Sequence, residues 1–396
     1  MPLKILHIND TCTGCGACVS ACPKNALTLS YNDEGFYYPH LNEDLCVRCK
    51  LCEKVCHVLK NDLPEEPSRE FTPIMLKAKS KKIMSMSSSG GVFSLLADYI
   101  IKQGGVVYGA RYNYEKEQLE HISTDICDIS ELRKSKYIES YSGDSFKDVK
   151  LQLQKGRKVL YCGTPCQIKG LNTYLDSFKI KKENLLSVRF ICHGVPANKF
   201  FTEYKHYIEN KVGSSMEYLD FRPKTNGWRS SNMLMRFSNG KIIDEPYNYN
   251  YYYYYFQLNY LLRASCYNCH QLYQNTGDLT IADFWGIYKY RPENTDQDGI
   301  SLVLQQSEKG KQAIAAISNI CSIEELPQSA VDYIFKDADV KKPLFSQRGE
   351  MMNKVIKNGY MSEAKKALGL SIFKIKSKAG LKDILKKVGI WKLIRK

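Results

Sequence analysis

Eight of the fifteen cysteines form two runs with the same spacing, C-x2-C-x2-C-x3-C, which begin at Cys12 and Cys46. Three closely stepped thiolates with a more distant fourth are the ligands of a [4Fe-4S] cluster, and in two-cluster ferredoxins the fourth cysteine of each run serves the other cluster. Zinc more often takes two separate C-x2-C pairs, and a disulfide framework suits a secreted chain. The spacing therefore predicts two clusters, held by Cys12, Cys15, Cys18 and Cys56 and by Cys46, Cys49, Cys52 and Cys22.

More cysteines follow strand-like segments in the middle of the chain. Residues 158–161 lead into Cys162-Gly-Thr-Pro-Cys-Gln167, and residues 185–190 lead into Ile191-Cys-His-Gly-Val-Pro196. Because α/β sheets usually bind ligands at the carboxyl ends of their strands, these cysteines are expected to converge there. The alternative is that each cysteine is a small core residue.

A Ser-Gly-Gly turn at Ser89–Gly91 precedes residues 92–101, which have helical spacing. Free amides and the positive dipole end at a helix start favour the binding of an anion or a phosphate. An ordinary helix N-cap is the alternative, and it is favoured when the motif is taken alone.

The elements that must position these residues belong to a globular chain of two or three domains. Of its 396 residues, 25% are charged and 43% are hydrophobic. We predict an α+β fold with a bacterial two-cluster ferredoxin-like domain at 1–60, a linker at 61–73, an α/β domain at 74–340 and a basic amphipathic helical tail at 341–396. Within the first domain, Ile5–Ile8 and Ala26–Ser30 are predicted strands. The many cysteines, with no secretory signal or apolar membrane-spanning run, favour the cytoplasm.

The positive charge is concentrated near the end of the sequence. The formal net charge is +15, and residues 371–396 alone carry +8. This amphipathic segment suits a helix on an anionic membrane surface, or equally one that packs on the body or on a partner. The tyrosine-rich run Tyr247–Phe256 lacks alternating basic residues, which favours a packing role over base stacking. Nucleic acid is therefore not a predicted partner.

Five motifs occur in an order that resembles a known family. They are Ser88–Phe93, Gly163–Leu171, Cys192–Pro196, Cys266-x2-Cys269 and Asp283–Gly286. The set resembles the beta-subunit family of coenzyme F420 hydrogenases and dehydrogenases, which includes 7-hydroxymethyl chlorophyll a reductase. The resemblance covers most of residues 80–310, and a two-cluster module ahead of this domain is a familiar arrangement in the family.

The resemblance implies that the α/β domain binds FAD and a third [4Fe-4S] cluster. The implied cluster ligands are Cys166, Cys192, Cys266 and Cys269, with Cys162 as a spare candidate. The implied flavin contacts lie in the two Gly-containing turns. They are Ser89, Gly90, Gly91, Gly163, Thr164, Pro165 and Gln167. His193 is the candidate catalytic residue, as a proton donor near the flavin, and a supporting hydrogen-bonding role is its alternative.

These cofactors imply an iron–sulfur flavin-dependent oxidoreductase, because clusters carry single electrons and a flavin passes them on in pairs. The alternative is a non-catalytic electron-transfer subunit of a larger reductase or hydrogenase complex. The expected partners are an electron donor or acceptor protein such as ferredoxin and a small-molecule or lipid-linked substrate. Many bacterial relatives with this module are encoded near surface-polysaccharide genes, which suggests a role in surface polysaccharide biosynthesis. A peripheral contact with the inner membrane face through residues 371–396 is a further expectation.

Overall fold

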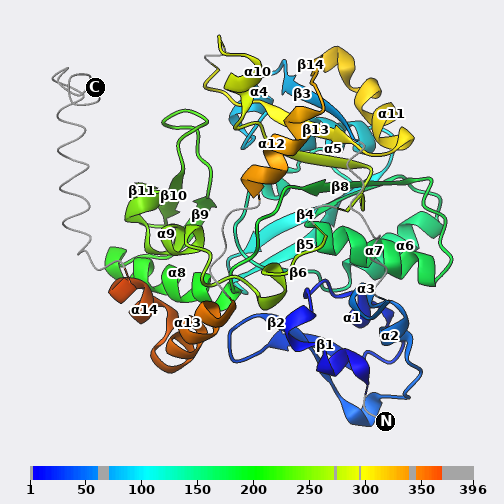
Figure 1. The fold of residues 1–396 in the computed structure, drawn as a ribbon, viewed down its shortest axis with the longest axis vertical. Coiled ribbons are helices and arrows are strands. Elements are labelled where there is room, and N and C mark those ends of the chain that lie inside the picture. The colour runs from blue at the N-terminus through cyan, green and yellow to red at the C-terminus, as the bar shows by residue number, and fades with distance from the viewer. Residues whose placement is uncertain (1–2, 61–70, 272–273, 294–295, 339–344, 368–396) are drawn as a thin grey trace.

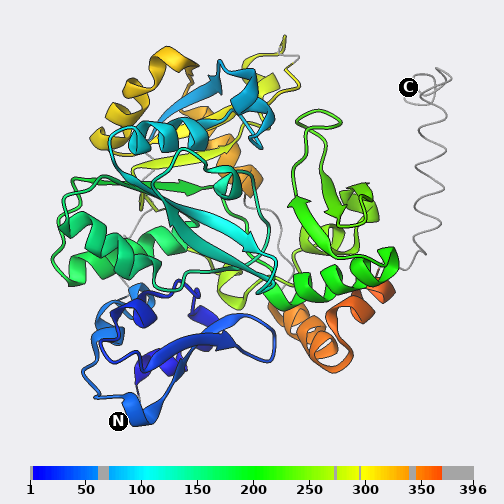
Figure 2. The ribbon, with the colours of Figure 1, turned by 180° about the vertical axis from the view of Figure 1, so that it is seen from behind.

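The computed structural model describes residues 3–60, 71–271, 274–293, 296–338 and 345–367. A nine-stranded sheet lies in the middle of the molecule, with the segment before residue 61 against one end and a smaller helix-rich unit at its side (Figures 1 and 2). Among the described residues, no helix is both long and apolar enough to cross a bilayer.

The first domain is a small two-stranded unit with short helices. Strand β1 (Leu27–Tyr31) pairs antiparallel with β2 (Tyr37–Leu41), which agrees with the strand predicted at Ala26–Ser30. The strand predicted at Ile5–Ile8 is wrong, because Lys4–His7 forms a 3-10 turn that buries Ile5 alone. That turn packs Ile5 against Leu3, Leu27 and Cys52. The helices are α1 (Ala17–Ala21), α2 (Leu51–Lys54) and α3 (His57–Lys60).

The central sheet has the strand order β14-β3-β13-β12-β8-β7-β4-β5-β6. Strands β12, β8, β7 and β4 run parallel to one another, so the carboxyl ends of these four lie at one edge. The first strand begins at Thr72, within the predicted linker. The strands are β3 (Thr72–Ala78), β4 (Val106–Asn113), β5 (Gln118–Thr124), β6 (Ser140–Tyr141), β7 (Val159–Gly163), β8 (Leu185–Phe190), β12 (Leu279–Asp283), β13 (Ser301–Gln305) and β14 (Cys321–Glu325).

Helices cover both faces of this sheet because successive strand residues point to opposite sides. In β7, Leu160 packs into a core with α5 and α11, whereas Val159 and Tyr161 pack into a second core with α6 and α7. Both faces of the strand are therefore buried, as its apolar run requires. The helices are α4 (Lys81–Ser85), α5 (Val92–Ile101), α6 (Ser145–Gln154), α7 (Pro165–Ser177), α10 (Ile287–Tyr290), α11 (Glu308–Ala316) and α12 (Ser329–Ala338).

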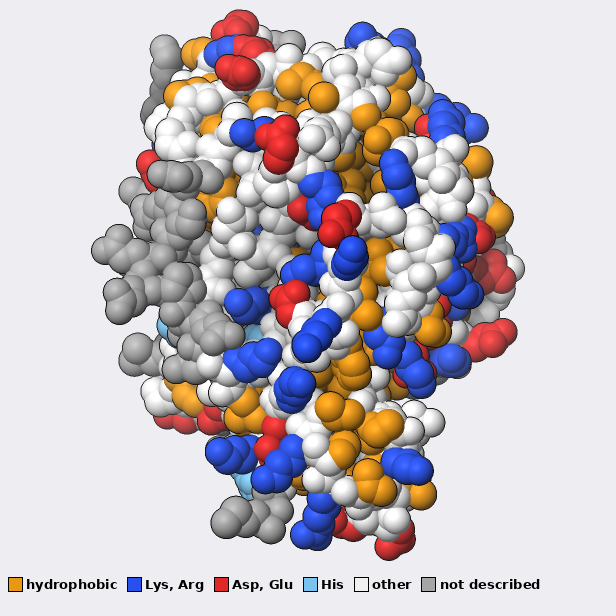
Figure 3. Space-filling model, turned by 90° about the vertical axis from the view of Figure 1, so that its right-hand side faces the viewer, with side chains coloured by type: hydrophobic (Ala, Val, Ile, Leu, Met, Phe, Trp, Pro, Cys, Tyr) orange, Lys and Arg blue, Asp and Glu red, His pale blue; other side chains and the backbone are white. Residues whose placement is uncertain are grey.

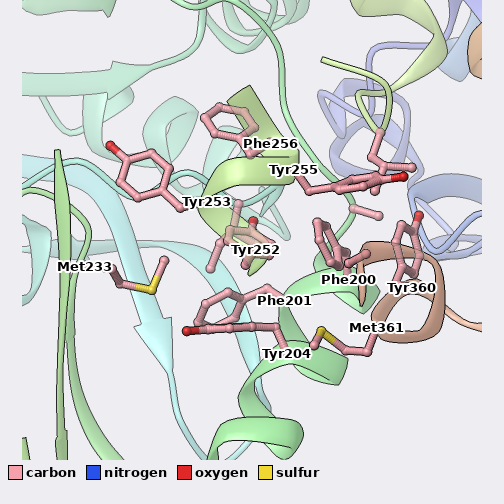
Figure 4. Close-up of a cluster of buried hydrophobic side chains, with 14 of the residues drawn as sticks. Phe200, Phe201, Tyr204, Met233, Tyr252, Tyr253, Tyr255, Phe256, Tyr360 and Met361 are labelled. Carbon is pink, nitrogen blue, oxygen red and sulfur yellow. The ribbon is translucent and has the colours of Figure 1, made fainter. Parts of the chain in front are cut away.

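The helix-rich unit is built around aromatic side chains (Figure 4). The tyrosine-rich run forms α9, where Tyr252, Tyr253 and Tyr255 are buried, so the predicted packing role is confirmed. Met352 and Tyr360 join the same core, so helices beyond residue 341 pack into the body. Residues 371–396, with their predicted membrane contact, lie outside the described residues. The elements are α8 (Asn198–Val212), β9 (Met216–Asp220), β10 (Asn232–Phe237), β11 (Ile242–Pro246), α9 (Tyr251–Gln257), α13 (Phe345–Asn358) and α14 (Tyr360–Ala367).

A glycine lets helix α7 approach the first cysteine loop. A Cβ atom at Gly170 would lie 2.8 Å from Cys15 Sγ and 3.0 Å from Cys15 Cβ. We expect Gly170→Ala to lower stability by about 1–3 kcal/mol through overpacking, despite the higher helix propensity of alanine. The midpoint of thermal unfolding measures this loss.

The matched control is Gly349→Ala in helix α13, where an added Cβ meets nothing within 4 Å. This change is expected to stabilise the chain by about 0.5–1 kcal/mol. Equal shifts of the unfolding midpoint in the two variants would contradict the close approach of α7.

Candidate functional site: three groups of cysteines

The four cysteines predicted for the first cluster lie together. Burial raises the pKa of Cys15 to about 12, and negative charge on Cys56 and Cys12 adds to the rise. Burial also raises the pKa of Cys18, with further contributions from Cys15, Cys12, Cys56 and Cys52. Thiols that share a buried space and oppose one another's ionisation need a cation to become thiolates together. This donor set therefore fits an iron cluster.

The four cysteines predicted for the second cluster line one small cavity. Cys22, Cys46, Cys49 and Cys52 all contribute to its wall, together with Pro23 and Leu27. Cys49 is exposed, whereas Cys52 is buried. Because Cys52 also affects the ionisation of Cys18, the two groups of cysteines are neighbours.

The structure also brings together the four cysteines that the family resemblance implies for a third cluster. Cys166 lies in the first turn of α7, and Cys192 follows β8. Cys266 ends the 3-10 turn Ala264–Cys266, and Cys269 follows that turn. Burial raises the pKa of Cys166, the Thr164 hydroxyl opposes the rise, and Cys269, Cys192 and Cys266 add to it.

The spare candidate, Cys162, has a different environment. Burial raises its pKa to about 12, and the charged neighbour that opposes this rise is Lys136.

The residues that the resemblance implies for flavin binding on the Gly-Thr-Pro turn lie at the start of α7. Thr164 and Gln167 form a reciprocal capping box, with the Thr164 amide donating to Gln167 Oε1 at 2.9 Å. Pro165 occupies the first turn, where its missing amide hydrogen costs nothing, and Gly163 ends β7. The Thr164 hydroxyl also lies 3.1 Å from Cys166 Sγ. These residues therefore orient a candidate cluster ligand.

The Ser-Gly-Gly turn is held against the sheet. The Ser89 hydroxyl donates to the Ile300 carbonyl at 2.8 Å, and the Gly90 amide donates to Ser301 Oγ at 2.9 Å. A Cβ atom at Gly90 would lie 2.2 Å from the Leu76 carbonyl oxygen, and Gly91 has a φ of +88°. The Gly90 amide is thus used inside the protein, so this turn offers fewer donors to a phosphate than the sequence suggests.

Basic side chains that the sequence analysis missed gather beside this turn. The Lys224 ammonium donates to the Ser89 carbonyl at 2.9 Å. Burial lowers its pKa to about 8, Asp283 and Asp298 oppose this shift, and Lys134 and Arg222 add to it. Burial likewise lowers the pKa of Lys136 to about 8. Converging cations with lowered pKa values are typical of a site for an anion. The Arg-Lys-Ser-Lys segment at 133–136 is the sequence feature from which a group of cations could have been predicted.

His193, the candidate proton donor, stacks on an aromatic ring of α9. Its ring centroid lies 4.8 Å from that of Phe256, at an interplanar angle of 23°. Its neighbour in the chain is Cys192, so it lies beside the third group of cysteines.

Two buried residues connect the first and third groups of cysteines. Burial raises the pKa of the Tyr161 hydroxyl, which lies close enough to Cys15 and Cys166 for both to raise it further. The buried Arg263 guanidinium is affected by Cys12 and Cys266 and donates to the Cys12 carbonyl at 2.7 Å. The two groups are therefore adjacent across the joint between the domains.

A different cluster of potential metal ligands is already occupied by a lysine. Glu117, His206 and Glu209 are the only such triad with ligand atoms within 4.8 Å among the described residues. The Lys205 ammonium lies 2.7 Å from Glu117 Oε1 and 2.9 Å from Glu209 Oε2. This triad is an ion-pair network, with the lysine in the place of a metal.

Comparison with known proteins identifies both parts of the chain. Residues 156–329 match the family defined by the C terminus of the coenzyme F420 hydrogenase/dehydrogenase beta subunit, and residues 11–59 match a 4Fe-4S dicluster domain. The chain is 24% identical to one of the subunits of the F(420)H(2) dehydrogenase of Methanosarcina mazei over 221 residues, which cover 51% of this chain and 61% of the relative.

Two further matches are shorter. One is 34% identity over 85 residues to a component of the H(2):CoB-CoM heterodisulfide,ferredoxin reductase of Methanothermobacter thermautotrophicus, covering 17% of this chain and 13% of that component. Another is 34% identity over 56 residues to an uncharacterized ferredoxin of Methanocaldococcus jannaschii, covering 14% of this chain and 71% of the ferredoxin. The chain thus spans about three fifths of the first relative and about an eighth of the second.

A solved structure is similar at low sequence identity. It is a chain of the F420-reducing [NiFe] hydrogenase complex from Methanosarcina barkeri, with a TM-score of 0.44 and 17% identity over 74% of this chain and 90% of that chain. The order of the motifs in the sequence and the two family matches indicate the same family. The chain belongs to the coenzyme F420 hydrogenase/dehydrogenase beta-subunit family and carries a 4Fe-4S dicluster domain ahead of the family's C-terminal region.

Proposed function

We propose that this chain is an iron–sulfur flavoprotein oxidoreductase that connects a one-electron protein partner to a two-electron substrate. The observation that carries the proposal is the adjacency of three groups of four cysteines, with Tyr161 and Arg263 between the first and the third. When bound, the clusters would supply single-electron transfer and FAD would supply its conversion to two-electron chemistry. The chain's own residues would hold the clusters close together, with Cys49 exposed toward a partner.

The exposed end of the dicluster domain supports docking of a protein partner. Leu45 and Val47 are 49% and 59% exposed beside the exposed Cys49, and Arg48 and Lys50 are exposed on the same loop. Figure 3 shows hydrophobic and basic side chains together at the lower end of the molecule. Glu43 and Asp44 are exposed on the same loop, and Arg48 pairs with Glu43. The exposed apolar patch therefore supports docking of an electron carrier such as ferredoxin more than the net charge of the loop does.

The basic side chains beside the Ser-Gly-Gly turn support the binding of a flavin phosphate. Since burial lowers the pKa of Lys136 to about 8, this residue loses its charge as the pH rises through that value. A bound phosphate favours the charged form, so FAD affinity should be constant below about pH 8 and fall above it. We expect Lys136→Met to weaken FAD binding about tenfold near pH 7 and to flatten the pH profile.

Fluorescence titration of FAD into the flavin-depleted protein, from about pH 7 to about pH 9, measures both effects. The exposed Lys116→Met is the control, because this lysine lies on the β4–β5 turn and pairs with Glu120. A pH profile that stays the same in the Lys136 variant would contradict a phosphate at this position.

Turnover of a soluble acceptor separates an enzyme from a purely electron-transferring subunit. The full chain, purified without oxygen and supplied with FAD, is mixed with reduced ferredoxin and a two-electron acceptor such as a quinone or a deazaflavin. The proposal predicts reduction of the acceptor that depends on bound FAD. Reduction only after addition of a second protein would favour the alternative, an electron-transfer subunit of a larger complex. The lipid-linked substrate and the membrane contact stay predictions from the sequence.

A further inference from the structure

Arg189 is a fully buried cation at the carboxyl end of β8, three residues before Cys192. Its Nε donates to Thr280 Oγ1 at 2.7 Å, and its Nη1 donates to the Gln271 carbonyl at 2.8 Å. The other terminal nitrogen, Nη2, is buried with no hydrogen-bond partner among the described residues. Nη1 also donates to Thr276 Oγ1 at 3.5 Å. The side chain is therefore fixed by three neutral acceptors, while both hydrogens of Nη2 are unused.

Comparison with the other buried arginines shows that a buried guanidinium with only neutral partners is unusual here. Four arginines are buried in the described part of the chain, and three of them pair with a carboxylate. Arg222 lies 3.1 Å from Asp283, Arg263 pairs with Glu139, and Arg348 lies 2.5 Å from Glu34. Arg189 pairs with no carboxylate among the residues that the structure describes. A buried charge without a counter-charge is strongly unfavourable, so a negative group is expected next to it.

The acidic group that acts on Arg189 is the thiol of Cys269. Burial lowers the pKa of Arg189 to about 10, and Cys269 is the neighbour that opposes this shift. Cys269 belongs to the third group of cysteines through its effect on Cys166. Gln271, which accepts from Arg189, lies two residues after Cys269, so the arginine also anchors the loop that carries this ligand.

We propose that Arg189 is the counter-ion of a [4Fe-4S] cluster held by Cys166, Cys192, Cys266 and Cys269, and that it raises the reduction potential of this cluster. A cluster with four thiolate ligands is anionic, and it gains one more negative charge when it accepts an electron. A fixed cation nearby therefore stabilises the reduced form more than the oxidised form. The inference rests on the proposed function, because it assumes that the third cluster is present.

The position of Arg189 in the sheet suits this role. Thr280 on β12 lies directly beside Arg189 in the parallel register, and its hydroxyl donates to Gln306 Oε1 at 2.6 Å. The acceptor that fixes Nε is thus fixed in turn by a second side chain. A cation held in this way contributes a constant field at the carboxyl edge, with little reorganisation when the charge of the cluster changes.

The test compares Arg189→Met with Arg189→Lys in the full chain, reconstituted with iron and sulfide without oxygen. Redox titration followed by electron paramagnetic resonance gives the ratio of reduced to oxidised third cluster at a fixed potential. We expect this ratio to fall about tenfold or more in the methionine variant, as for a unit charge roughly 10 Å away in protein. The lysine variant should recover most of the loss. The two clusters of the dicluster domain are internal controls and should be unchanged.

If the methionine variant loses the third cluster, the iron content of the protein still tests the proposal. A fall from about twelve to about eight irons per chain, with retention in the lysine variant, would also support the counter-ion role. A ratio in Arg189→Met within about twofold of the wild-type ratio, or the same change in both variants, would overturn it. Wild-type protein with only about eight irons would instead overturn the third cluster, and with it the proposed function on which this inference rests.

Discussion

Replacing Cys266 by serine is expected to remove about four of about twelve irons per chain, while Cys162→Ser leaves the iron content unchanged. Both side chains are partly buried. Cys266 belongs to one of the five motifs, and Cys162 directly precedes another. They differ in their neighbours, because Cys266 affects the ionisation of Cys166, whereas the charged neighbour of Cys162 is Lys136. We therefore propose Cys266, and not Cys162, as a ligand.

The measurement is an iron and acid-labile sulfide assay on protein purified without oxygen, with Mössbauer spectra to distinguish cluster types. Cys12→Ser is the control for a different group and should affect a cluster of the dicluster domain. The assignment of the third group would be contradicted if Cys162→Ser and Cys266→Ser lost the same amount of iron. Retention of about twelve irons in the Cys266 variant would contradict it as well.

The two-cluster domain was predictable from the sequence because its ligands lie close together in the chain. The spacing of Cys12, Cys15 and Cys18 is itself the geometry of a loop around a cluster, and a dicluster domain matches residues 11–59. The predicted strand at Ile5–Ile8 was wrong. This short segment buries one side chain and has no partner strand that would stabilise an extended conformation. Short apolar runs do not distinguish strands from helical turns by their pattern alone.

The third group could be predicted only through the resemblance, because its members come from three segments far apart in the chain. Each motif alone also suits a core cysteine or a helix cap, and the structure gives Thr164 and Gln167 such a capping role. Arg189 stands in a mostly apolar strand, which is a sequence signal of a buried charge. A charge inside a buried strand needs a partner, but the sequence does not say which distant residue supplies it.

A buried ion pair between Arg263 and Glu139 lies at the joint between the dicluster domain and the α/β body. Arg263 is 1% exposed, pairs with Glu139, and donates to the Cys12 carbonyl at 2.7 Å and to the Tyr37 carbonyl at 2.9 Å. Glu139 Oε2 in turn accepts from the Tyr37 amide at 3.0 Å. The pair therefore links the α/β body to the first cysteine loop and to β2 of the dicluster domain.

Arg263→Met is expected to lower stability by about 3–5 kcal/mol, because it leaves the Glu139 carboxylate buried and the Cys12 and Tyr37 carbonyls without their donor. Glu139→Leu should cost a similar amount by leaving the guanidinium unpaired. The double variant should cost clearly less than the sum of the two single changes, since an ion pair replaced as a whole leaves no uncompensated charge. Urea unfolding followed by tyrosine and tryptophan fluorescence, on iron-loaded protein without oxygen, measures the three values.

The rate of iron release distinguishes positioning of the first cysteine loop by the ion pair from a general loss of folding. If the pair positions the first cysteine loop, iron should leave the single variants faster than wild-type protein in the presence of a chelator, at urea concentrations where the body is still folded. The exposed ion pair between Arg48 and Glu43, at 3.6 Å, is the matched control, and its removal should change stability by less than about 1 kcal/mol. Additive costs in the double variant would mean that Arg263 and Glu139 act independently, and the joint would then depend on the packing of Gly170 against Cys15 instead.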